Sequence, residues 1–74
     1  MNISAVNGLD GMKLSVALTK QKQNGTPESY IGFLIRIGED YIILDYDKAS
    51  NNNVTGISRV IISLDIIQGI WVYK

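Results

Sequence analysis

The sequence predicts a small, mainly β domain in which five strands form a strongly bent barrel behind a short N-terminal helix. Apolar and polar residues alternate over short runs, and polar stretches rich in Gly, Asn and Ser separate these runs. The 74 residues make one domain, residues 1–74, and contain no cysteine. So short a chain without disulfides depends on a dense apolar core or on self-association.

Residues 1–11 predict one or two helical turns. Asn2 or Ser4 can cap the N-terminus of this helix, and Gly11 can end it. The first strand is expected over residues 12–19, because Leu14, Val16 and Leu18 alternate with polar or small residues. The polar stretch over residues 20–29 then predicts an exposed loop or hairpin end.

A central hairpin is expected over residues 30–47, with a tight turn at residues 38–40. Simple alternation puts Phe33, Ile35 and Ile37 on one face of its first strand, and Leu34 on the other. Both faces carry apolar groups, so the hairpin belongs inside a sheet that is covered on at least one side. Gly32 predicts a sharp bend or a close backbone approach.

The remaining apolar runs predict two further strands. One is expected over residues 57–64 and the other over residues 69–73, with a single helical turn at residues 64–67 between them. A polar connection over residues 48–56 precedes them. So short a link between the last two strands is typical of a small five-stranded barrel.

The residue inventory argues against an enzyme. The chain has no His and no Cys, so it lacks the usual nucleophile and general base for neutral pH. It also lacks phosphate-binding and dinucleotide fingerprints, and we expect no cofactor. Asp45 and Asp47 share a strand face and are oxygen ligands suited to Ca²⁺ or Mg²⁺. We interpret them instead as a solvated strand edge and assign no metal.

No apolar run reaches the ~18–20 residues of a membrane span, and the N-terminus lacks a signal-peptide pattern. We therefore expect a cytoplasmic protein without a membrane partner. Seven basic and seven acidic residues give zero net charge, which excludes a globally basic nucleic-acid binder.

The chain resembles the Sm/LSm family of RNA-binding proteins. The stretch LDGMKLSVAL, residues 9–18, is similar to the family's first-strand pattern. Features that look like the first Sm motif are Gly32, Leu34, the acidic turn Glu39-Asp40, and Asp45 or Asp47. The resemblance implies a bent, Src-homology-type five-stranded barrel behind a short helix. It also implies subunits that join through their fourth and fifth strands into a homo-oligomeric ring.

Two departures from the family pattern bear on RNA. After the acidic turn the family has an aromatic residue or Met and then an Asn, which contact uridine. Here Tyr41 fits the first position, but Ile42 cannot hydrogen-bond a base. Residues 63–66 lack the basic residue of the second Sm motif. We therefore expect weak, salt-sensitive RNA contact, with these candidates: Tyr41, Asp40, Arg36, Lys20, Lys22 and Lys48.

The apolar excess of residues 57–73 suggests an interface between subunits. The candidates are Val60, Ile61, Ile62, Ile70, Trp71 and Val72. Trp71 suits either the core or the interface. The alternative function is a non-enzymatic protein-interaction or structural module on a small barrel, which the zero net charge favours.

Overall fold

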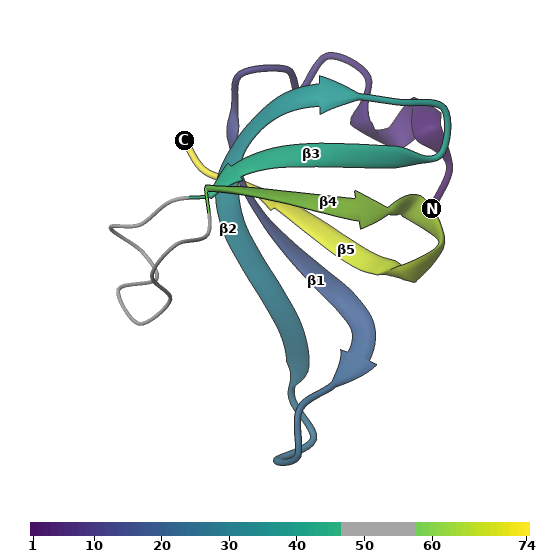
Figure 1. Ribbon diagram of the computed structural model, residues 1–74, viewed down its shortest axis with the longest axis vertical. Helices are drawn as coiled ribbons and strands as arrows, with labels where there is room; N and C mark the ends of the chain where they lie inside the picture. Colours follow the sequence, from purple (N-terminus) through teal and green to yellow (C-terminus); the bar gives the residue numbers. More distant parts are fainter. Residues whose placement is uncertain (47–57) are drawn as a thin grey trace.

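The computed structural model describes residues 1–46 and 58–74 (Figure 1). Its elements are the 3-10 helix η1 (Ile3–Val6), strands β1 (Lys13–Gln21), β2 (Pro27–Ile37), β3 (Tyr41–Tyr46) and β4 (Arg59–Ser63), the 3-10 helix η2 (Leu64–Ile66) and strand β5 (Ile67–Val72). The predicted mainly β class with five strands is confirmed. Neither helix in the described part of the chain has the length and apolar character to cross a membrane.

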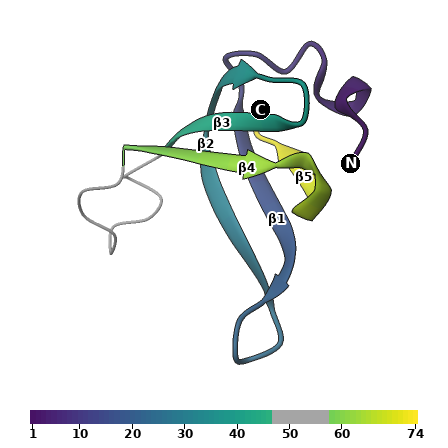
Figure 2. The same cartoon turned by 45° about the vertical axis from the view of Figure 1, so that its right-hand side comes forward.

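All five strands form one antiparallel sheet in the order β4-β3-β2-β1-β5. The sheet is curved but not closed, because β4 pairs only with β3, and β5 only with β1, within the described residues (Figures 1 and 2). The expected barrel is therefore an open, bent sheet whose two edges are β4 and β5. The short helix η2 joins these two edge strands directly.

The N-terminal helix is shorter than the sequence predicted. It is a single 3-10 turn, capped by the Asn2 side chain, which accepts a hydrogen bond of 3.0 Å from the Ser4 N–H. The predicted cap at Asn2 is thus confirmed, but the helix ends before Gly8 rather than at Gly11. Gly8 has a positive φ of 85°, a left-handed conformation that turns the chain out of the helix.

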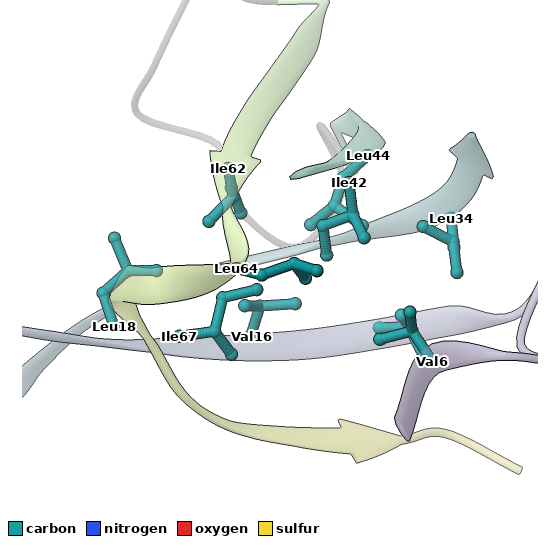
Figure 3. Packing of buried hydrophobic residues seen from close by; sticks show 10 residues of the cluster. Val6, Val16, Leu18, Leu34, Ile42, Leu44, Ile62, Leu64 and Ile67 are labelled. Carbon is teal, nitrogen blue, oxygen red and sulfur yellow. The ribbon is translucent and has the colours of Figure 1, made fainter. Parts of the chain in front are cut away.

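The core lies on the concave side of the sheet, where alternate residues of each strand point (Figure 3). The predicted inward set of β1, Leu14, Val16 and Leu18, is confirmed. Val6 of η1 covers one end of this core and is fully buried. The cluster comprises Val6, Leu14, Val16, Leu18, Leu34, Ile42, Leu44, Ile62, Leu64 and Ile67.

A bulge in β2 corrects the predicted faces of this strand. The register against β3 shifts between Leu34 and Arg36. Phe33 and Ile35 remain on the outer face, 43% and 45% exposed, but Ile37 packs against the core. The prediction that Ile37 shares a face with Ile35 is wrong, because one extra residue reverses the alternation beyond the bulge.

Gly32 marks a close approach of two backbones, as predicted. A Cβ at this position would overlap the main-chain oxygen of Asp45 and stand 3.3 Å from the Leu44 Cβ. No side chain fits between β2 and β3 here, so the glycine allows the sheet to bend tightly.

Candidate functional site

The turn between β2 and β3 lines an open hollow of about 560 Å³. Residues from the end of β2, the turn, the start of β3 and the N-terminal helix contribute to it. They are Ile3, Arg36, Ile37, Gly38, Glu39, Asp40 and Tyr41. Three of the predicted RNA-contact residues, Arg36, Asp40 and Tyr41, therefore share one site.

The turn is built around Gly38 and Tyr41. The Gly38 N–H donates a hydrogen bond of 2.8 Å to the main-chain oxygen of Tyr41. The Tyr41 ring lies so close over Gly38 that a Cβ there would overlap the ring atoms. One side of the ring is thus covered by backbone, which leaves Tyr41 half-buried. A planar group has only the uncovered part of this ring to stack against.

The hollow lies where three segments distant in sequence meet. The Leu64 N–H at the start of η2 donates a 2.8 Å hydrogen bond to the main-chain oxygen of Asp40. The Met1 amino group donates one of 2.9 Å to the main-chain oxygen of Leu64. The β2–β3 turn, η2 and the N-terminus are therefore held together at one end of the sheet (Figure 1).

The rim of the hollow has mixed charge. The guanidinium of Arg36 and the carboxylates of Glu39 and Asp40 are all exposed. These three side chains give the rim a net charge of −1, which does not favour a phosphate. Within the described residues, no group of three or more His, Cys, Asp and Glu side chains is arranged to hold a metal ion. The hollow therefore suits a neutral ring that stacks on Tyr41 better than a phosphate.

The remaining RNA-contact candidates do not join this site. Lys20 and Lys22 lie at the opposite end of β2, where β1 turns into β2. Figures 1 and 2 show this β1–β2 connection far from the turn between β2 and β3. Lys48 lies outside the described residues.

The candidate interface residues divide into three classes. Ile61, Trp71 and Val72 are 69%, 60% and 45% exposed, so Trp71 lies outside the core. Val60 and Ile70 are half-buried. Ile62 belongs to the hydrophobic core, with only 2% of its surface exposed. The exposed members lie on the two opposite edges of the sheet, Ile61 on β4 and the other two on β5.

Three residues outside the predicted site set also shape these surfaces. Gly38 supports the Tyr41 ring, and Gly69 lies under the Trp71 ring, whose nearest atom would be 3.1 Å from a Cβ at position 69. Tyr73 extends the exposed aromatic surface past the end of β5 and is 46% exposed. The Gly-x-Trp spacing at residues 69–71 was the available signal, because residues two apart on a strand share a face.

Comparisons with protein-family models, curated proteins and solved structures give no match to this chain. The resemblance to the Sm/LSm family therefore stays a prediction.

Proposed function

We propose that this chain is an Sm-like subunit that assembles head to tail, with β4 of one copy pairing with β5 of the next. The observation that carries this proposal is the position of the exposed apolar side chains. Ile61 lies on one edge of the sheet, and Trp71 and Val72 lie on the other. Edge strands with unpaired backbone groups and apolar side chains favour pairing with another strand.

The register of the sheet makes the two edges compatible. A cross-strand row on the outer face consists of Arg59, Asp45, Phe33 and Lys13. On β4, Ile61 lies two residues after Arg59. On β5, Trp71 pairs with Ser15 of β1, and Ser15 lies two residues after Lys13. Ile61 and Trp71 therefore lie on the same face of the sheet. When β4 meets β5 of a second copy, both side chains can contact each other on one continuous surface.

Pairing of two different edges is heterologous, so it produces a ring if the rotation between copies closes. Such an assembly would bury apolar side chains that a monomer of this size leaves in water.

RNA contact is a second candidate function, and the hollow favours it. Tyr41 offers part of an aromatic face beside the Arg36 guanidinium, and bases stack on such faces without strong sequence preference. The Asp40–Leu64 hydrogen bond also joins the two segments that correspond, by resemblance, to the RNA-contacting motifs of the Sm family.

Self-assembly is tested by light scattering after gel filtration of the wild type and two matched variants. Ile61→Asp puts a charge on the β4 edge, whereas Ile35→Asp puts it on the exposed outer face of the internal strand β2. We expect a wild-type particle of several subunits, a monomer for Ile61→Asp and an intact particle for Ile35→Asp. A monomeric wild type, or equal dissociation by both variants, would contradict edge pairing and favour a monomeric interaction module.

A further inference from the structure

The turn between β1 and β2 forms a projecting arm, defined here as residues 19–27. β5 pairs with β1 only as far as Leu18, and β3 pairs with β2 only from Gly32 onward. Within the described residues, the two halves of the arm pair only with each other, through Gln21 and Pro27. The arm consequently points away from the rest of the sheet in both views (Figures 1 and 2).

The tip of the arm is closed by its own hydrogen bonds, and none of its side chains belongs to the core cluster. The Lys22 N–H donates a 2.7 Å hydrogen bond to the Thr26 main-chain oxygen, and the Gly25 N–H donates one of 3.0 Å to the Lys22 main-chain oxygen. The Asn24 side chain accepts hydrogen bonds of 3.0 and 2.6 Å from the N–H and hydroxyl of Thr26. All nine residues are nevertheless exposed. None of these side chains contributes to the buried core, so all of them are accessible to a binding partner.

The chemistry of the arm differs from that of the rest of the chain. Its charged residues are Lys20 and Lys22, and its other polar side chains are amides and hydroxyls: Thr19, Gln21, Gln23, Asn24 and Thr26. The rest of the chain holds five basic and seven acidic residues. The nearest acidic residue in the sequence is Glu28, half-buried at the base of the arm. The arm is thus a positive, hydrogen-bonding projection on a negative body.

From this juxtaposition we infer that the β1–β2 arm is a nucleic-acid-binding ribbon, in which Lys20 and Lys22 contact backbone phosphates. Lysine, amide and hydroxyl side chains are among the groups that hydrogen-bond the phosphodiester backbone, and amides also reach base edges. A two-stranded ribbon has the width to enter the major groove of duplex DNA. The site lies at the far end of β2 from the hollow and does not depend on self-assembly.

Two phosphate contacts set the expected salt dependence. Each bound arm should give a slope of log affinity against log salt of about −1.8 on duplex DNA and about −1.4 on a single strand. On duplex DNA, this corresponds to a loss of about twelve-fold per arm between 50 and 200 mM salt. An assembly that engages several arms would multiply this slope.

The test measures fluorescence anisotropy of a labelled DNA duplex of about 20 base pairs and a labelled single-stranded RNA of about 20 nucleotides, across a salt series. The double variant Lys20→Gln/Lys22→Gln should abolish most of the salt-dependent binding, and Lys20→Arg/Lys22→Arg should retain it. Lys74→Glu is the matched control, because it changes the net charge by the same amount at an exposed position outside the arm. This control should bind with the wild-type slope.

Binding of either polymer through the arm supports the inference. The probe that binds more tightly shows whether the arm prefers duplex DNA or single-stranded RNA. No binding of either probe by the wild type at low salt would overturn it. Equal losses in the arm variant and in Lys74→Glu would also overturn it, because net charge alone would then explain the binding. The particle mass of each variant, measured in parallel, separates this outcome from a failure of the assembly proposed above.

Discussion

The aromatic ring of Tyr41 lies directly over the backbone of Gly38, and the Gly38 N–H donates a 2.8 Å hydrogen bond to the Tyr41 main-chain oxygen. These two residues close the β2–β3 turn and form one wall of the hollow. The ring is held by contact with glycine backbone, so its position depends on the absence of a side chain at residue 38.

Gly38→Ala should displace the Tyr41 ring into solvent at a small cost in stability. The new methyl group would overlap ring atoms, and a ring at the end of a flexible side chain can swing away. We expect a loss of less than about 1 kcal/mol in the free energy of unfolding. Increased quenching of tyrosine fluorescence would report the exposed ring. The contribution of Tyr41 is the difference between each protein and the same protein carrying Tyr41→Phe. Unchanged quenching would contradict the contact.

Gly32→Ala should cost more, because the overlapping group is backbone. A Cβ at residue 32 would overlap the main-chain oxygen of Asp45, which cannot move without breaking the pairing of β2 with β3. We expect about 1–3 kcal/mol of destabilisation, as for an overpacked core position. Urea unfolding of Gly32→Ala and Gly38→Ala side by side gives the comparison. An equal or smaller loss at Gly32 would argue against the close approach.

The bulge in β2 predicts unequal effects at two isoleucines that simple alternation treats alike. Ile37 packs against the core, whereas Ile35 is 45% exposed on the outer face. Ile37→Ser should therefore destabilise the fold by about 1–3 kcal/mol, and Ile35→Ser by less than about 0.5 kcal/mol. Chemical denaturation distinguishes the two. Similar losses at the two positions, or a larger loss at Ile35, would contradict the bulge, because unbroken alternation puts both side chains on one face.

If the hollow contacts RNA, Tyr41 should contribute through stacking. Loss of an aromatic face costs about 1–3 kcal/mol per base, so Tyr41→Ala should weaken binding of a short U-rich or A-rich RNA by about five- to 150-fold. Tyr41→Phe keeps the ring and should bind like the wild type. Arg36→Ala should reduce affinity most at low salt, where electrostatic attraction is strongest. Fluorescence anisotropy measures each, and wild-type affinity in Tyr41→Ala would exclude the hollow as the RNA site.

The local features of this fold were predictable because they depend on neighbouring residues. Alternation in β1 identified Leu14, Val16 and Leu18 as one buried face, and the side chain of Asn2 caps η1 through the N–H of Ser4. The Asn24-Gly25 pair marked the turn at the tip of the arm, where Gly25 adopts a positive φ of 86°. Each feature follows from a side chain acting within a few positions of itself.

The candidate site was predictable only in part. Arg36, Asp40 and Tyr41 are close in sequence and do share the hollow, whereas Lys20 and Lys22 were grouped with them by charge alone. Charge carries no information about which end of a strand a residue occupies. The separation of these lysines from Tyr41 follows from the direction of β2, which runs from the arm to the hollow.

The sequence by itself thus determined the strand-forming runs, the alternation of side chains and the chemistry of the turns. Tertiary structure decided which face of each run is buried. It put Ile62 in the core and left Ile61 exposed at the β4 edge. It also moved the Ile37 side chain to the core face, through a bulge in the pairing of β2 with β3. It also joined Asp40 to Leu64 across 24 positions of sequence. The reason is physical: a period of two fixes which residues share a face, but the partner strand and the curvature of the sheet select the face that is buried.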